Sequence, residues 1–414
     1  MVDHRLSGSK WPAMDAVSTF PPDRTTALER LQAFVPRAGR DYAAGRNFDH
    51  GPGRHESVSG LSPYLRCRLI TEEEVLRAVL GQHSASAAEK FIQEVYWRTY
   101  WKGWLELRPG VWDQYQRALR SRLDEMQTQS GLRDRWEAAC KGETDIDCFN
   151  AWAQELVTTG YLHNHARMWF ASIWIFTLGL PWEPGADFFL RHLLDGDPAS
   201  NTLGWRWVAG IQTPGKTYLA RTSNISKFTE GRFHPKWQLA GEAPARAGPP
   251  VPDPLPLPGP VRPDPALRTG LLMHEDDLSP GYAFAGCDAV ARAVLAPQTG
   301  FTPLTPAPHI AGFRSAASLD AQTRHMPAAD DCSDVLRDAE ALMIWAQKEG
   351  LSQIVTPFAP VGPVADQLRR FAAHEGAPRV VTMMRATDRA AWPLATRGFF
   401  AFRKNIPDLL SALT

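Results

Sequence analysis

The spacing of apolar residues changes once along the chain, and this change predicts two structural parts. From Thr25 to about Trp237, apolar residues recur at intervals of three and four, the period of a helix with one buried face. Almost no stretch alternates between apolar and polar residues, as a half-buried strand would. Helices are predicted over 26–34, 71–80, 86–106, 112–127, 145–160, 163–179, 184–194 and 200–211. The first part is therefore expected to be mainly α and all-helical.

A proline-rich segment follows the helical part. Between Leu239 and Arg268, prolines are dense, and from Pro250 to Pro258 they stand at every second position. Proline lacks the amide hydrogen and favours polyproline II, so neither a helix interior nor a central strand can form. We expect a flexible arm at 1–21, a helical domain at 22–238, a semi-rigid linker at 239–268 and a further domain at 269–414.

After the linker, short apolar runs alternate with helical patterns. Strands are predicted at 269–274, 311–314, 352–357 and 379–384, and helices at 331–349 and 364–374. The helix at 331–349 is expected to begin at Asp331 or Ser333 as its capping residue. This alternation predicts a smaller α/β domain with an open parallel sheet and helices on both faces. The chain has no G-x-G-x-x-G, so we infer no dinucleotide site there.

Composition adds one positive signal and several exclusions. The chain has 15 Trp, most of them between Trp97 and Trp237, which is more than packing usually needs and indicates an aromatic or redox function. The 45 basic and 45 acidic residues cancel, so nothing global favours nucleic-acid binding, although a local basic face is still compatible with that balance.

The cysteines and the N-terminus indicate where the protein works. Five scattered cysteines without a C-x-x-C suit a reducing cytosol, and we expect no metal or iron–sulfur site. The first twenty residues lack the apolar core of a secretory signal, and the most apolar helix, around Trp169–Leu180, is too short to cross a bilayer. We expect a cytoplasmic, soluble monomer without a membrane partner.

Two segments hold residues suited to bind a flat, charged ligand. In Ser57–Leu65, hydroxyl groups and a glycine lead into a turn that could hold phosphate, although an ordinary capped helix start would look the same. On the next predicted helix, Glu94, Trp97, Arg98 and Trp101 stand at i, i+3, i+4 and i+7 and so share one face. This face could stack a flat ring and bind its polar edge, but an amphipathic helix with a Glu94–Arg98 ion pair is the simpler alternative.

A third segment combines a helix with an acidic loop. Asn164, Arg167 and Met168 share one helix face. Asp195 and Asp197 lie further on, in a loop that lacks the spacing of an EF-hand calcium site. A loop whose carboxylates pair with Arg167, or accept N–H groups of a ligand, is the better interpretation.

Together these segments resemble the photolyase/cryptochrome family, over most of residues 40–235 and closest to cyclobutane pyrimidine dimer photolyases. The matching motifs, in the family's order, are S-x-L-S-P at Ser59–Pro63, E-x-x-W-R at Glu94–Arg98, N-x-x-R-M at Asn164–Met168 and D-G-D-x-x-x-N-x-x-x-W-x-W at Asp195–Trp207.

The resemblance implies FAD as the cofactor. It also implies an ion pair between Arg167 and Asp195 over the flavin, and Asn201 opposite flavin N5. The residues implied to bind FAD are Tyr42, Ser59, Gly60, Leu61, Ser62, Phe91, Glu94, Arg98, Asn164, Arg167, Asp195, Gly196, Asp197 and Asn201. Val58 replaces the hydroxyl residue that usually opens the phosphate loop, so one phosphate contact is expected to be lost. Whether a second, antenna chromophore binds is unknown.

The resemblance further implies light-dependent DNA repair, in which excited, reduced FAD passes an electron to a cyclobutane pyrimidine dimer. This deoxyribodipyrimidine photo-lyase activity is expected because Asn201 is typical of photolyases, and Asn164 stands where six-four enzymes usually have His. The implied partner is UV-damaged DNA, single- or double-stranded. The residues that match the lesion site are Glu94, Trp97, Asn164, Met168 and Trp207. The alternative is a cryptochrome-like blue-light photoreceptor without repair activity.

The family's tryptophan chain for photoreduction also has matches. Trp205 matches the inner member and Trp182 the middle one. Trp136 is a candidate for the outer member, with a structural role as the alternative. Photolyases normally begin with an α/β antenna domain, whereas the α/β pattern here follows the helical part, so we hypothesise a relocated antenna-type fold at residues 269–414.

Overall fold

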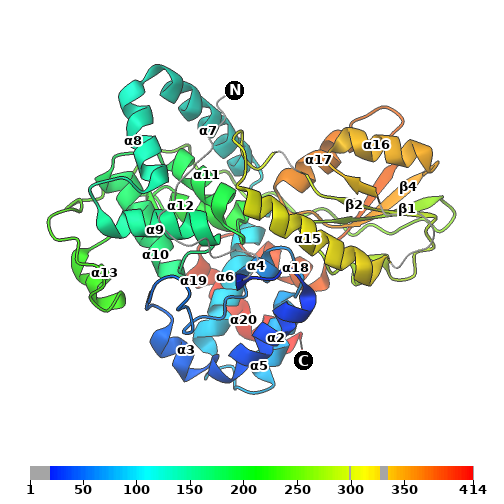
Figure 1. Ribbon diagram of the computed structural model, residues 1–414. Coiled ribbons are helices and arrows are strands. Elements are labelled where there is room, and N and C mark those ends of the chain that lie inside the picture. The colour runs from blue at the N-terminus through cyan, green and yellow to red at the C-terminus, as the bar shows by residue number, and fades with distance from the viewer. Residues whose placement is uncertain (1–18, 298–299, 327–333, 414) are drawn as a thin grey trace.

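The computed structural model describes residues 19–297, 300–326 and 334–413 (Figure 1). Most of the predicted arm, and the predicted caps Asp331 and Ser333, lie outside these residues. None of the helices in the described ranges is both long enough and apolar enough to cross a membrane.

The first part of the chain is helical, as predicted. Helix α6 packs directly against α12. A π-helical turn at Ile173–Thr177 follows α10. The helices are α2 (Arg24–Phe34), α3 (Arg40–Gly45), α4 (Ser62–Arg66), α5 (Glu72–Leu80), α6 (Glu89–Glu106), α7 (Gly110–Thr128), α8 (Ser130–Lys141), α9 (Asp147–Thr159), α10 (Asn164–Ser172), α11 (Trp182–His192), α12 (Pro198–Val208) and α13 (Thr222–Phe228).

The second part contains a parallel five-stranded sheet in the order β3-β2-β1-β4-β5. Helices α16 and α17 cover one face of the sheet, and α15 packs on the other (Figure 1). The predicted smaller α/β region with a parallel sheet is therefore confirmed. Its elements are β1 (Thr269–His274), α14 (Gly281–Phe284), β2 (Ala291–Leu295), α15 (Pro308–His325), β3 (Asp334–Leu336), α16 (Ala339–Lys348), β4 (Gln353–Pro357), α17 (Pro363–Ala372) and β5 (Arg379–Met383).

Two predictions in this part were wrong. Residues 311–314 were expected to form a strand but lie inside α15, because a four-residue apolar run does not distinguish a strand from one turn of a buried helix. The helix predicted at 331–349 begins only at Ala339, where the Asp338 side chain accepts a hydrogen bond from the Ala341 amide (2.8 Å). Residues Asp334–Leu336 form strand β3 instead.

After β5 the chain returns to the helical part. Helices α18 (Ala386–Ala391), α19 (Phe399–Phe402) and α20 (Ile406–Ser411) contribute side chains to the same apolar core as α6. Gly103 of α6 lies so close to Trp392 that a Cβ atom there would stand 2.8 Å from the Trp392 Cα. The sheet region and the helical part are thus joined by a continuous core.

Buried ion pairs also join the two parts at the carboxyl end of β1. Arg66, at the end of α4, pairs with Asp276 (2.6 Å) and donates from Nε to the Gly196 carbonyl (3.0 Å). Arg68 pairs with Asp277 (3.3 Å) and with Asp388 (2.8 Å). Arginine suits such positions because its planar group can serve several acceptors at once. Through Gly196, this interface reaches the loop between α11 and α12.

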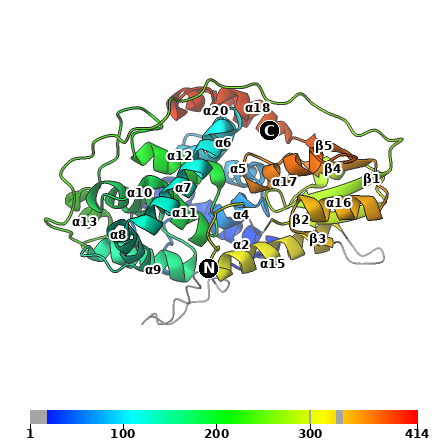
Figure 2. The same cartoon turned by 90° about the horizontal axis from the view of Figure 1, so that it is seen from above.

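The proline-rich segment forms neither helix nor strand between residues 239 and 268. It crosses the molecule from the region of α13 to β1 and passes the helices after β5 (Figure 2). Hydrogen bonds hold it: the Leu255 amide donates to the Leu107 carbonyl (2.8 Å), and Arg108 Nε donates to the Pro252 carbonyl (2.9 Å).

Candidate functional site

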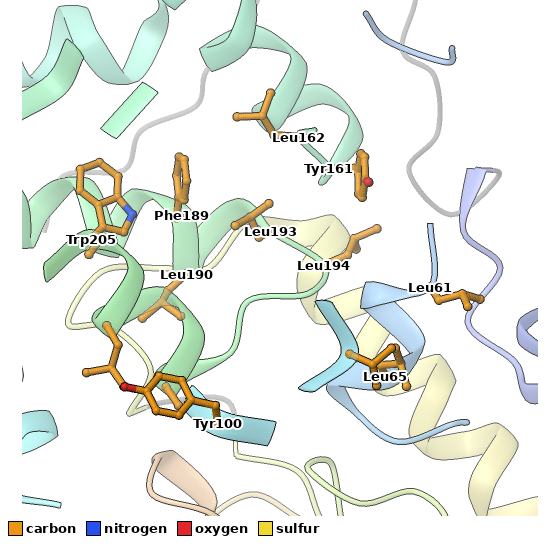
Figure 3. Close-up of a cluster of buried hydrophobic side chains, with 14 of the residues drawn as sticks. Leu61, Leu65, Tyr100, Tyr161, Leu162, Phe189, Leu190, Leu193, Leu194 and Trp205 are labelled. Carbon is orange, nitrogen blue, oxygen red and sulfur yellow. The ribbon is translucent and has the colours of Figure 1, made fainter. Parts of the chain in front are cut away.

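The predicted cofactor residues converge around α6, α12 and the loop that leads into α12. Apolar side chains of a single buried cluster surround this region (Figure 3). Those labelled in the figure include Leu61 and Leu65 from the α4 region, Tyr161 and Leu162 from the segment before α10, Leu193 and Leu194 after α11, and Trp205 of α12. Their burial keeps water from the polar groups between them and so strengthens the electrostatic interactions there.

The ion pair predicted between Arg167 and Asp195 is present. The guanidinium binds the carboxylate through two parallel contacts, Nη1–Oδ1 at 3.0 Å and Nη2–Oδ2 at 2.9 Å. Arg167 Nε also donates to the Leu162 carbonyl (2.8 Å), which fixes the plane of the guanidinium. Burial would raise the pKa of Asp195, but the charge and hydrogen bonds of Arg167 outweigh this effect, so the pKa is lowered. Asp195 is therefore a buried, ionised carboxylate.

Asp197 forms the second buried anion of the site. Its Oδ2 accepts the Ser200 amide (2.8 Å) as the cap of α12, and its Oδ1 lies 3.6 Å from Lys102 Nζ. Burial opposes ionisation, but Lys102 and Arg98 on α6 lower the pKa of Asp197 to about 2. Both α6 cations thus hold the first turn of α12 in place.

This lowered pKa gives the first testable prediction. In the unfolded chain the pKa of Asp is about 3.9, so Asp197 contributes its full stability above pH ~4 and loses it as the pH falls towards 2. A shift of this size corresponds to about 2 kcal/mol of unfolding free energy. We expect Asp197→Asn, which keeps a capping side chain, to lose less stability than the wild type between pH 4 and pH 2. Urea unfolding at several pH values measures this, and equal pH dependence in the two proteins would contradict it.

The predicted phosphate loop has the backbone that such a role needs. Gly60 has a φ of +61°, and a Cβ atom there would lie 2.7 Å from Arg30 Nη1. The Ser59 hydroxyl accepts the Leu61 amide at 3.4 Å, and a Ser62 hydrogen bond helps to lower the pKa of Asp195. The loop thus lies beside the Arg167–Asp195 pair.

Tyr42 and Phe91, also predicted to contact the cofactor, pack edge to face at 5.2 Å. Both are buried, and burial raises the pKa of Tyr42 well above its usual value. The phenol therefore remains protonated at neutral pH.

Two side chains leave polar atoms free for a ligand. The Arg98 Nη1 atom is buried and has no hydrogen-bond partner within the described residues. Asn201 donates from Nδ2 to the Ala186 carbonyl (2.8 Å), which leaves Oδ1 to accept another bond. A buried N–H without an acceptor is costly unless a ligand supplies one. A guanidinium, an amide, hydroxyls and a glycine turn are the groups that would bind the polar edge and phosphates of FAD, so these residues fit that cofactor.

The residues predicted to face a DNA lesion lie in several environments. Glu94 is paired with Arg46, but burial raises its pKa by more than Arg46 lowers it. Asn164 is exposed at the start of α10, with Met168 one turn further on and half-buried. Trp207 lies against Tyr218 at 5.6 Å, and Trp97 stacks on Phe399 at 3.6 Å. Their role at a lesion stays a prediction.

The three tryptophans predicted to form an electron route lie in different aromatic surroundings. Trp205 is buried and contacts Phe189 (5.2 Å) and Trp174 (6.1 Å). Trp182 lies against Tyr115 (5.5 Å). Trp136 is half-buried on α8, and its Nε1 has no hydrogen-bond partner within the described ranges. The order Trp205, Trp182, Trp136 stays a prediction.

Sequence reasoning missed four residues of this region. Lys102 and Arg46 could have been found, because each stands four residues after a predicted site residue, Arg98 and Tyr42 respectively. Trp174 lies in a π-helical turn, and Phe399 reaches Trp97 across more than 300 residues of chain, so no local pattern indicates either residue.

Comparison with known families matches residues 91–237 to the FAD binding domain of DNA photolyase. This segment is thus similar to the FAD-binding domain of photolyases. The match includes α10, α12 and nearly all of α6, nine of the fourteen predicted cofactor residues lie within it, and FAD is the cofactor of this domain.

Photolyases of several bacteria resemble the chain over part of their length. A deoxyribodipyrimidine photo-lyase of Synechococcus sp. is 33% identical over 195 residues, which are 45% of this chain and 39% of that protein. One from Streptomyces griseus is 29% identical over 277 residues, 58% of each protein. The chain thus spans roughly two to three fifths of these relatives.

A solved class III photolyase from Agrobacterium tumefaciens is 28% identical, with 55% of this chain and 47% of that chain covered and a TM-score of 0.44. The family assignment rests on the sequence matches.

Proposed function

We propose that the protein is a light-dependent DNA repair enzyme, a deoxyribodipyrimidine photo-lyase that splits cyclobutane pyrimidine dimers. The observation that carries this proposal is the arrangement of α6. One turn of this helix holds both Arg98, whose free N–H fits the cofactor, and Glu94, an acid whose pKa is raised by burial. A cofactor and a substrate that bind on the same face of α6 would therefore lie next to each other.

Each residue of the site has a role that its environment supports. FAD, when bound and reduced, supplies light absorption and a single electron. Arg98, Asp197 and Asn201 hold and orient it, and the buried apolar side chains exclude water. Glu94 donates a hydrogen bond or a proton to the negative charge that develops on a pyrimidine carbonyl as the dimer opens, and a raised pKa favours the protonated form.

The test is dimer loss from UV-irradiated oligothymidylate under blue light, with purified protein whose flavin is reduced and a dark control. We expect light-dependent loss of dimers. In Glu94→Gln, which keeps the shape of the side chain but lacks the acid, we expect repair to fall by about tenfold or more while FAD stays bound.

One outcome would contradict the proposed activity, and another would contradict the role of Glu94. No dimer loss from a protein with bound, photoreducible FAD would rule out repair of this lesion and leave a blue-light sensor as the function. Unchanged repair in Glu94→Gln would show that this carboxyl does not act on the substrate.

A further inference from the structure

One face of the Trp97 indole is covered by an aromatic ring. The ring of Phe399 stacks on it, with centroids 3.6 Å apart and planes inclined by 13°. Tyr100 and Trp101 also contact the indole, at 5.7 Å and 5.2 Å, but neither stacks on it. Trp97 itself is only half-buried, so these rings leave part of it accessible. A planar group that stacks on the face covered by Phe399 therefore meets an occupied face.

Phe399 is held in this position by its neighbours. The Tyr100 hydroxyl donates to the Arg397 carbonyl (2.9 Å), and Arg108 Nη2 donates to the Thr396 carbonyl (2.8 Å). These bonds fix the backbone just before α19 against α6. Phe399 is 4% exposed, whereas Phe400, the next residue, is 74% exposed. The fold thus directs one phenylalanine of this pair onto Trp97 and the other into solvent.

The 3.6 Å between the rings of Trp97 and Phe399 is similar to the distance between a nucleobase and the aromatic ring on which it stacks. Carbon atoms attract most strongly at about 3.5–4.0 Å, and a nucleobase on an aromatic ring adopts a similar spacing. A base and Phe399 therefore need the same volume over the indole and cannot occupy it together.

We propose that Phe399 is a residue of the substrate site that competes, within the molecule, with a pyrimidine dimer for the stacking face of Trp97. The inference rests on the proposed function, because it takes Trp97 as the base-stacking residue. Dimer binding then displaces the Phe399 ring from the indole, and the affinity for damaged DNA is lower than the open pocket would give. An undamaged DNA strand that stays on the surface does not contact Phe399, so the affinity for undamaged DNA is unaffected.

The test is the affinity of the FAD-loaded protein for dimer-containing oligothymidylate, measured in the dark by fluorescence anisotropy. We expect Phe399→Ala to bind about tenfold more tightly than the wild type, because the competing ring is gone. Phe402→Ala is the neighbouring control: Phe402 is also buried and its ring contacts Tyr96, Tyr100 and Phe399, but not Trp97. Its affinity should equal that of the wild type or be lower.

A second pair of variants separates competition from a change in stability. In a Trp97→Ala background, Phe399→Ala should give no gain, since there is no indole to uncover. Phe399→Leu keeps a buried apolar side chain but lacks the flat ring, so it decides the question if Phe399→Ala does not fold, and it should bind several-fold more tightly than the wild type.

The results distinguish this inference from the proposed function. If the wild type binds dimer-containing DNA and neither Phe399 variant binds it more tightly, the inference is wrong and the proposed function stands. If the Phe399 variants bind more tightly but no variant repairs dimers in light, the inference holds and repair is wrong. If no variant binds dimers, both are wrong.

Discussion

Arg167→Ala is expected to lower the unfolding free energy by about 3–5 kcal/mol and to release FAD during purification. The Asp195 side chain is 3% exposed and would lose the guanidinium that lowers its pKa against the effect of burial. Removing one member of a buried ion pair is far more costly than the net contribution of the pair, because the remaining ion is neither paired nor hydrated. Urea unfolding and the flavin absorbance that survives gel filtration measure the two effects.

Two control variants isolate the cause of this loss. Arg77 forms an ion pair with Glu73, four residues earlier on the surface of α5, at 2.8 Å. The Arg77 side chain is 61% exposed. Arg77→Ala should therefore cost less than about 1 kcal/mol. Adding Asp195→Asn to Arg167→Ala should recover part of the stability, since no unpaired charge is left. A loss below about 1 kcal/mol for Arg167→Ala alone would contradict the prediction.

Trp205→Phe is expected to abolish photoreduction of the flavin and to leave chemically reduced protein active in repair. Trp205 is 2% exposed, and its ring contacts three further aromatic residues, Phe170, Phe189 and Trp174. An indole gives up an electron much more readily than a phenyl ring, so electron transfer stops at position 205 while packing is largely kept. The loss of oxidised-flavin absorbance under blue light, with an external thiol as donor, measures the rate.

Trp112→Phe is the matched control for this experiment. Trp112 is also fully buried, but its ring contacts Tyr115 and not Trp205. The flavin of the Trp112→Phe protein should be photoreduced at a rate closer to the wild-type rate than the flavin of the Trp205→Phe protein. Normal photoreduction in Trp205→Phe would show that electrons reach the flavin by another route.

The fold could be predicted where the sequence has long, strongly periodic patterns. The helix predicted at 86–106 is α6 (Glu89–Glu106), and the one at 200–211 is α12 (Pro198–Val208), so only the ends differ. Short elements were missed or misassigned. Strand β3 has only three residues, too few to show a period, and residues 311–314 carry no sign that they belong to a longer helix.

Site residues that lie close together in the sequence could be predicted more easily than those that are far apart. Asn201 and Asp197 stand close together in the sequence, and the Arg167–Asp195 pair joins two recognisable motifs that are 28 residues apart. Contacts made by the returning chain were not predictable. Phe399 reaches Trp97 only because α18, α19 and α20 fold back onto α6, and this return depends on tertiary packing that no sequence window contains.

The packing of these late helices on α6 has a consequence for how the protein is made. Tyr100 and its partner Arg397 are 297 residues apart. At about 5–20 residues per second, the ribosome would need roughly 15–60 s to add that stretch of chain. During this time the apolar face of α6 around Gly103 has no Trp392 to cover it. The helical part of the nascent chain is therefore expected to require shielding by a chaperone until the last helices emerge from the ribosome.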